Sequence, residues 1–129
     1  MSRPKRKRNI SRPPIMEGFK PFGIAMKDLE PIILLFEEYE AIRLKDYEGL
    51  SQLEASEKMN VSRPTLTRIY ESARSSISKA FIEGKAIFIE GGNYEMEDLW
   101  YRCNSCKKLN IKMDNCKYCN SDELISLNQ

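Results

Sequence analysis

The chain has 129 residues, of which 41% are hydrophobic and 31% charged, a composition that suits one globular domain with a small appendage. It contains no histidine, the usual general base at neutral pH, and no glycine-rich phosphate-binding motif, so we do not expect an enzyme. Its longest apolar run, Ile32–Phe36, is far shorter than the roughly 18 residues of a membrane span. Its charged N-terminus lacks the apolar core of a secretory signal. We therefore expect a cytoplasmic protein with no membrane partner.

The net charge of +2 conceals a basic N-terminal segment. Residues 1–28 carry eight lysines and arginines against two acidic residues. Prolines among the first residues predict an extended arm without regular structure, and Phe19 and Phe22 in the turn-rich segment that follows are expected to anchor it to a core. Such an arm can neutralise phosphates, although the same charge also fits a solvated tail with no partner. The expected phosphate contacts are Arg3, Lys5, Arg6, Lys7 and Arg8.

The stretch DLEPIILLFEEYEAIRLKDYEG, residues 28–49, predicts the first helix. Pro31 suits a first helical turn, where its missing N–H is not needed, and Gly49 suits a C-terminal stop. Apolar residues at helical spacing fall on one face: Ile32, Leu35, Phe36, Tyr39 and Ile42. Charged residues are expected to face away from the core: Glu37, Glu38, Glu40 and Lys45.

Two further helices follow, separated by a tight turn. Ser51–Glu54 is a capping box that begins a short helix, and Asn60 can adopt the left-handed conformation of a sharp turn. A long helix is expected to follow, with Ser62 as its N-cap and Pro64 in its first turn. Pro64 disfavours helical geometry at Arg63, which leaves the first helical residue open. The buried face of this helix is expected to hold Leu66, Ile69, Tyr70, Ala73, Ile77, Ala80 and Phe81.

Residues 86–89, AIFI, predict a short strand that ends at Gly91–Gly92. A lone strand needs a partner, which the N-terminal segment, the C-terminal module or a second chain can supply. We therefore expect a mainly α fold with a short β element, in three parts. These are a basic arm with a turn-rich segment (1–28), a helix–turn–helix domain (29–92) and a four-cysteine module (93–129).

The pair of helices around Asn60 has the spacing of a DNA-reading element. Such an element presents the N-terminal side chains of its second helix to base edges, while the first helix crosses the backbone. Arginine binds guanine bidentately, threonine contacts a phosphate or a thymine methyl, and the helix N-terminus favours a phosphate. The same corner is also a common way of packing two helices, but the capping box and the basic arm favour DNA. The expected contacts are Ser62, Arg63, Pro64, Thr65, Thr67 and Arg68.

Two C-x2-C pairs separated by nine residues lie near the C-terminus, a spacing typical of zinc sites. Because the chain has no histidine, the site is all-thiolate, and four protein ligands close the coordination sphere. This favours one structural zinc ion; iron at a tetrathiolate site stays open, whereas disulfides fit a cytoplasmic chain poorly. The four expected ligands are Cys103, Cys106, Cys116 and Cys119.

The stretch EGLSQLEASEKMNVSRPTLTRIYESA resembles the helix–turn–helix of sigma-factor region 4. Over roughly residues 3–94 the chain resembles the UPF0251 family of predicted DNA-binding proteins, in the segments RPKRKRNI, FKPFG, LEPIIL, EEYEAIRLKDYEGLSQLEASEKMNVSRPTLTRIYESAR and GKAIFIEGGNY. The resemblance implies a sequence-specific regulator of transcription that binds double-stranded DNA. The chain departs from the family pattern at three positions, where Leu53 replaces a glutamate, Ser56 an alanine and Asn60 the turn glycine.

The C-terminal module resembles a zinc ribbon, in which glycine often follows the second cysteine of each knuckle. Asn120 suits that position, but Lys107 suits it less well, so the first knuckle is expected to be irregular. Two other functions stay open: an adaptor that binds a protein partner of the transcription machinery through the ribbon and Leu53, and an RNA-binding protein that uses the arm and the ribbon. A homodimer also stays open, because two copies would double the base contacts.

Overall fold

The computed structural model describes residues 7–25, 27, 30–111 and 114–127. Along the chain lie β1 (Arg8–Asn9), β2 (Gly18–Phe19), β3 (Pro31–Leu34), α1 (Phe36–Ile42), the π-helical turn η2 (Arg43–Tyr47), α2 (Gln52–Met59), α3 (Arg63–Glu83), β4 (Ala86–Ile89), β5 (Tyr94–Glu95), β6 (Trp100–Cys103), β7 (Leu109–Ile111) and β8 (Leu124–Ser126). None of the helices in the described residues has the length and the apolar character that a bilayer-spanning segment needs.

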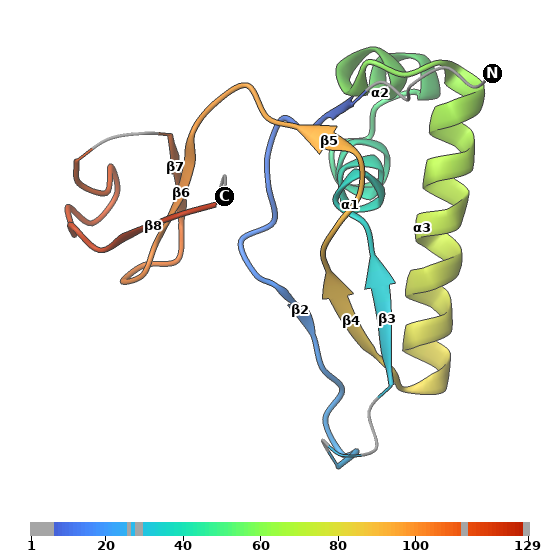
Figure 1. Ribbon diagram of the computed structural model, residues 1–129, viewed down its shortest axis with the longest axis horizontal. Coiled ribbons are helices and arrows are strands. Elements are labelled where there is room, and N and C mark those ends of the chain that lie inside the picture. Colours follow the sequence, from blue (N-terminus) through green and yellow to red (C-terminus); the bar gives the residue numbers. More distant parts are fainter. Residues whose placement is uncertain (1–6, 26, 28–29, 112–113, 128–129) are drawn as a thin grey trace.

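The expectation of a mainly α fold is wrong, because the described residues also form eight strands in three sheets. The central sheet has the order β2-β4-β3, in which β4 runs parallel to β3 and antiparallel to β2 (Figure 1). β1 pairs with β5, and the C-terminal module is an antiparallel sheet of order β7-β6-β8. β4 thus finds its partners within the chain, and its pairing gives no reason for a second copy.

The segment expected to begin a helix at Pro31 is instead strand β3. It pairs with β4 in parallel over its whole length, which its run of aliphatic residues suits well. Leu35 is still extended, at φ −69° and ψ 153°, and α1 begins only at Phe36. The helical spacing of the apolar residues therefore runs across a strand and a helix that face the same core.

The expected short helix and tight turn are confirmed in α2. The Ser51 hydroxyl accepts the Glu54 N–H at 3.1 Å, and the Glu54 carboxylate accepts the Ser51 N–H at 3.0 Å. Asn60 ends the helix in the left-handed conformation, at φ 58° and ψ 45°. Ser56 is buried, and its hydroxyl donates to the Leu53 carbonyl oxygen at 2.8 Å.

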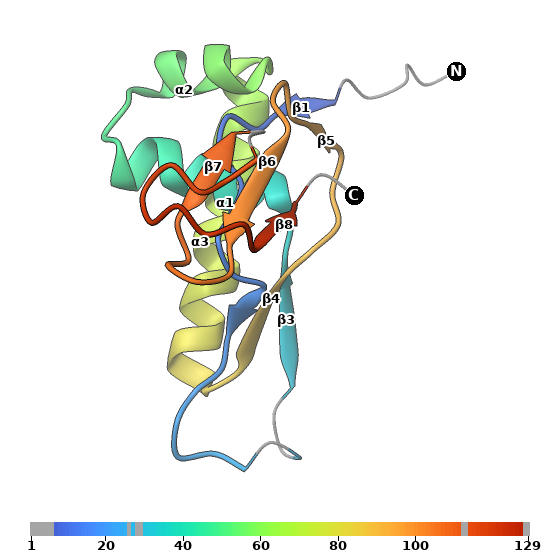
Figure 2. The same cartoon turned by 90° about the vertical axis from the view of Figure 1, so that its left-hand side faces the viewer.

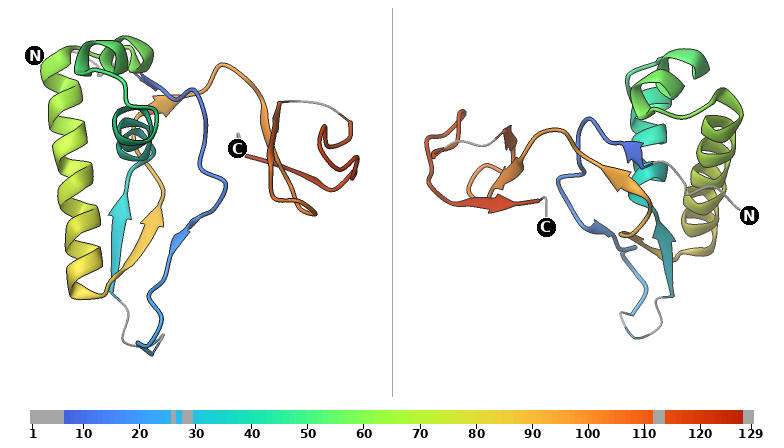
Figure 3. Two further views of the ribbon diagram at one scale, coloured as in Figure 1. Left: turned by 180° about the vertical axis from the view of Figure 1, so that it is seen from behind. Right: turned by 45° about the horizontal axis from the view of Figure 1, so that its top comes forward.

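Two apolar clusters hold the helices and the central sheet together. The first joins α1, η2, α2 and α3 through fully buried residues, which are Ala41, Leu44, Ala55, Met59 and Leu66. The second packs α3 on one face of the central sheet through Leu34, Ala73 and Ile89. The cysteine module lies on the far side of α1 and β2 from α3 (Figures 1 and 3).

Three aromatic residues lie outside the core, contrary to expectation. Phe81 is 82% exposed because it follows the sheet-facing Ala80 and is turned by about 100° from it around the helix. Phe19 and Phe22 are 59% and 103% exposed, so neither ring anchors its segment. The backbone of β2 does so, and it approaches β4 so closely that a Cβ on Gly18 would lie 1.9 Å from a carbonyl oxygen.

Candidate functional site

The first turn of α3 is polar and exposed. The Ser62 hydroxyl accepts the Thr65 N–H at 3.3 Å and donates to Thr65 Oγ1 at 2.9 Å. The helix begins at Arg63, with Pro64 in the first turn, where no intrahelical N–H is needed. The expected cap is confirmed, and Pro64 does not delay the start of the helix. Ser62, Arg63 and Pro64 are all exposed.

The second turn continues this polar surface. Arg68 is exposed, and its Nη2 donates to Thr65 Oγ1 at 3.2 Å. The half-buried Thr67 donates from Oγ1 to the Arg63 carbonyl oxygen at 3.1 Å. No acidic residue lies in the first turn, so nothing there offsets the positive end of the helix dipole. The six helix–turn–helix residues expected to contact DNA thus lie together in the cap and first two turns of α3.

The opposite side of α3 is held firmly. Leu66 is fully buried against α2. The Tyr70 hydroxyl donates to the Asp46 carboxylate of η2 at 2.6 Å, and this hydrogen bond is the main reason that the pKa of Tyr70 is raised. Lys45 and Arg74 both lie over the Tyr70 ring, within 6 Å of its centroid. These contacts fix the orientation in which α3 presents its first turns.

The basic arm joins the fold through a buried ion pair. The glutamates expected to face away from the core are buried instead, with Glu37 and Glu38 each 6% exposed. Glu37 Oε2 lies 3.3 Å from Arg8 Nε, and Glu37 Oε1 accepts the Asn93 N–H at 2.7 Å. Glu38 Oε2 accepts the Ser72 hydroxyl of α3 at 2.6 Å. Buried carboxylates need hydrogen-bond or ion-pair partners. Here the partners lie in segments that are distant from α1 in the sequence.

Glu40 is fully buried and forms the second attachment of the arm. Its carboxylate accepts the Ser11 N–H at 2.8 Å and two N–H groups of Arg43 at 2.7 and 2.9 Å. Burial lowers the pKa of Arg43, but the contacts with Glu40 and Glu48 outweigh it and leave the pKa raised. Arg43 is therefore a permanent cation that compensates the buried charge of Glu40.

Part of the arm has regular structure, contrary to expectation. Arg8 and Asn9 form β1, which pairs in parallel with β5, and Ile10 is 1% exposed. The Asn9 side chain donates to the Lys58 carbonyl oxygen of α2 at 3.0 Å. Lys7 is exposed. The other basic residues expected to contact phosphates lie outside the described residues; they are Arg3, Lys5 and Arg6.

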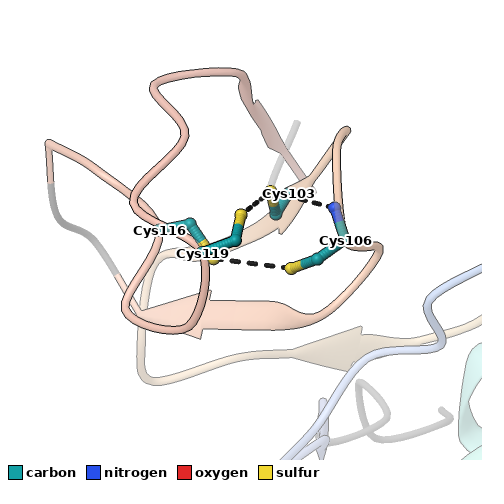
Figure 4. A group of neighbouring side chains, drawn as sticks. All are labelled: Cys103, Cys106, Cys116 and Cys119. Carbon is teal, nitrogen blue, oxygen red and sulfur yellow. Dashed lines mark hydrogen bonds between the residues drawn. The ribbon is translucent and has the colours of Figure 1, made fainter.

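The four cysteine sulfurs of the C-terminal module converge, all within 4.8 Å of one another (Figure 4). The sulfurs of Cys103 and Cys119 lie 3.5 Å apart, and those of Cys106 and Cys116 lie 3.6 Å apart. A tetrahedral ion with bonds of about 2.3 Å to sulfur places its ligands about 3.8 Å from one another. The four cysteines can therefore hold one metal ion.

The two knuckles have the same backbone geometry, so the expectation of an irregular first knuckle is wrong. Lys107 and Asn120 both adopt the left-handed conformation, at φ 67° and 63°. Their N–H groups donate to the carbonyl oxygens of Cys103 and Cys116, each at 2.9 Å. Lys107 thus takes the place of the customary glycine without changing the knuckle.

Hydrogen bonds to sulfur set the charge of the cysteines. Burial raises the pKa of Cys116, but the N–H groups of Cys119 and Tyr118 and the Asn110 amide bring it down to about 6. The Ser121 N–H lowers the pKa of Cys119, but burial and the other three sulfurs outweigh it and raise the pKa to about 11. Without a bound ion, Cys116 therefore loses its proton at a lower pH than Cys119 does.

Asn110 supports the cluster, and no spacing in the sequence pointed to it. It is 3% exposed, and its Nδ2 lies 3.4 Å from Cys116 Sγ. Its Oδ1 accepts the Lys117 N–H at 2.9 Å. Asn110 therefore ties β7 to the second knuckle and helps to orient one of the four ligands.

Known proteins are similar to this chain over most of its length. The family model described as "Protein of unknown function DUF134" matches residues 1–97. A UPF0251 protein of Chloroherpeton thalassium is 43% identical over 96% of this chain and 85% of its own length. The UPF0251 protein of Halothermothrix orenii is 47% identical over 82% of this chain and 78% of its own length. That of Moorella thermoacetica is 41% identical over 96% of this chain and 86% of its own length. No solved structure matches.

Proposed function

We propose that this chain, which belongs to the UPF0251 family and matches the DUF134 family model, is a sequence-specific DNA-binding protein that regulates transcription. α3 lies in the major groove of double-stranded DNA, with its first two turns against the base edges. The observation that carries the proposal is the surface on which Ser62, Arg63 and Arg68 are exposed, backed by the buried contact of α2 with α3.

Each residue of that surface has a role that its chemistry suits. Arg63 and Arg68 bind guanine edges or the adjacent phosphates, and the hydrogen bond to Thr65 holds Arg68 close to the helix surface before DNA binds. Thr67 contacts a thymine methyl or a phosphate. The N-terminus of α3, with Ser62 at its cap, faces a phosphate of the backbone.

The basic arm supplies affinity that depends on salt. Lys7 is exposed, and the Asn9–Lys58 hydrogen bond attaches the arm beside the end of α2, close to the turn that leads into α3 (Figure 2). From there Arg3, Lys5, Arg6 and Lys7 follow the phosphates of the duplex that α3 reads. Arg8 has a different role, because its guanidinium is paired with Glu37 and its side chain is only 13% exposed.

The metal ion in the cysteine cluster is zinc, and it is structural. Four thiolates fill a tetrahedral site completely and leave no position for a substrate. The sheet of the module is small, and an ion that ties Cys103 and Cys106 to Cys116 and Cys119 supplies stability that so few apolar residues do not.

Selection of bound sequences from a random duplex pool tests the proposal. We expect enrichment of one defined sequence and an affinity for it that falls steeply as the salt concentration rises. A pool that shows no enrichment would overturn the proposal. Tighter binding to RNA than to any selected duplex would favour the RNA-binding alternative instead.

A further inference from the structure

A cavity of about 930 Å³ lies between the helices and the cysteine module. Its lining comes from the arm (Arg12), from α1 and η2 (Tyr39 and Tyr47) and from the cysteine module (Lys108 and Tyr118). Its volume is within the range of small-molecule sites, about 300–1,000 Å³. No residue of α2 or α3 lines it, so it is separate from the proposed DNA-reading surface.

Three cations that line this cavity, Arg12, Lys107 and Lys108, differ from Arg43, which is paired with Glu40 and Glu48. Within the described part of the chain, no ion pair joins Arg12, Lys107 or Lys108 to an acidic residue. Arg12 lies 5.8 Å from the centroid of the Trp100 ring, and Lys108 Nζ lies 4.7 Å from that of Tyr118. Aromatic rings hold Arg12 and Lys108 in place without neutralising them, so the cavity favours an anion.

Glu48 is the one acidic residue among the described residues of the lining, and it already has a partner. Glu48 contacts the guanidinium of Arg43, whose other N–H groups donate hydrogen bonds to Glu40. Both carboxylates are therefore occupied by Arg43, and Arg12, Lys107 and Lys108 are left to receive a ligand, although Lys107 Nζ also donates to the Asn104 carbonyl oxygen at 2.7 Å. Three separate cations suit a phosphorylated molecule with several negative charges better than a single carboxylate.

Tyrosines supply the second half of the site. The rings of Tyr47 and Tyr118 are 86% and 52% exposed although they line a cavity. Tyr39 is half-buried, and its hydroxyl has no hydrogen-bond partner among the residues that the structure describes. Exposed rings are platforms on which a planar base can stack, and a free phenolic hydroxyl can bond to its polar edge or its sugar.

We propose that this cavity binds a nucleoside phosphate. The base stacks on the tyrosines, and the phosphates lie among Arg12, Lys107 and Lys108. The ligand contacts both α1–η2 and the cysteine module, and thus joins two parts of the chain. The site does not rest on the proposed DNA binding, since it shares no residue with α3.

Titration of the full-length, zinc-loaded chain with ADP tests the site, with binding followed by equilibrium dialysis. We expect saturable binding of one ADP per chain, and adenosine or pyrophosphate alone should bind at least tenfold more weakly. Lys108→Ala and Tyr47→Ala should each weaken ADP binding at least tenfold. Lys117→Ala is the matched control, because Lys117 lies over the same Tyr118 ring at 5.7 Å but does not line the cavity; it should bind ADP like the parent.

Zinc content and melting temperature identify variants that fold, and only these are compared. Absence of saturation by ADP would overturn the proposal. Pyrophosphate that binds as tightly as ADP would also overturn it, because the surface would then attract anions in general. A short RNA strand that binds more tightly than ADP and is sensitive to Lys108→Ala would assign the cavity to a nucleic acid. Because every variant leaves α3 intact, failure here leaves the DNA-binding proposal standing.

Discussion

The side-chain amide of Asn9 donates a hydrogen bond of 3.0 Å to the carbonyl oxygen of Lys58. Lys58 lies in the last turn of α2, just before the left-handed Asn60 leads into α3. The point where the basic arm joins the fold is therefore fixed beside the turn that orients the proposed reading helix. One duplex can then meet both the arm and the first turns of α3.

Removal of the arm's charge should reduce the salt dependence of duplex binding. Replacement of Arg3, Lys5, Arg6 and Lys7 by alanine should lower the slope of log K against log salt by about 0.9 for each lost phosphate contact. The matched control is Lys20→Ala with Lys27→Ala, two exposed cations outside the arm. Fluorescence anisotropy over a series of salt concentrations measures the slopes. An unchanged slope in the arm variant would show that these four residues make no phosphate contacts.

Loss of the buried Glu40 carboxylate should destabilise the fold strongly. Glu40→Ala leaves the half-buried Arg43 without its main partner and the Ser11 N–H without an acceptor, at a cost of about 3–5 kcal/mol. Glu57→Ala, at an exposed position of α2, is the control and should change stability by less than about 0.5 kcal/mol. Urea unfolding measures both. A loss below about 1 kcal/mol in Glu40→Ala would contradict the role of this contact.

Leu66 and Phe81 should respond very differently to truncation, although both have the spacing of one buried helix face. Leu66 is fully buried, so Leu66→Ala should cost about 2–5 kcal/mol. Phe81 is 82% exposed, and Phe81→Ala should change the free energy of unfolding by less than about 0.5 kcal/mol. Equal losses in urea unfolding would mean that Phe81 is covered in solution.

Zinc binding to the metal-free chain should release fewer than four protons at about pH 7.5. Cys116, whose pKa is lowered to about 6, is already a thiolate there, whereas Cys119, whose pKa is raised to about 11, must lose its proton. As the pH falls through about 6, Cys116 becomes protonated, so the number of released protons rises and the affinity for zinc falls. Calorimetry in buffers of different ionisation enthalpy counts these protons. Release of four protons at about pH 7.5 would contradict the low pKa of Cys116.

Features that depend on neighbouring residues could be predicted from the sequence. The capping box, the left-handed Asn60 and the Ser62 cap each involve groups within a few positions of one another, and all three are confirmed. The same holds for the four cysteines, whose spacing indicated that they can share an ion. These signals are local, so tertiary structure has little opportunity to override them.

Features that depend on distant partners could not be predicted. An apolar run such as residues 31–34 fits a strand or a helix equally well, and its strand partner β4 lies far along the chain. The burial of Glu40 depends on the Ser11 N–H, 29 positions away. Asn110 has no motif of its own and reaches Cys116 only because β7 folds beside the second knuckle. In each case the contact that determines the local structure or burial forms only when the chain folds.

Duplex binding by the double variant Arg63→Ala/Arg68→Ala tests the central claim most directly. On a sequence selected by the parent protein, loss of two arginine contacts of about 1–3 kcal/mol each predicts at least a roughly 30-fold weaker complex. Lys79→Ala should bind like the parent, because this exposed lysine lies on the same side of α3 but three turns further from the proposed groove. An unchanged affinity in a folded double variant would contradict the account, because α3 would then not be the helix that reads DNA.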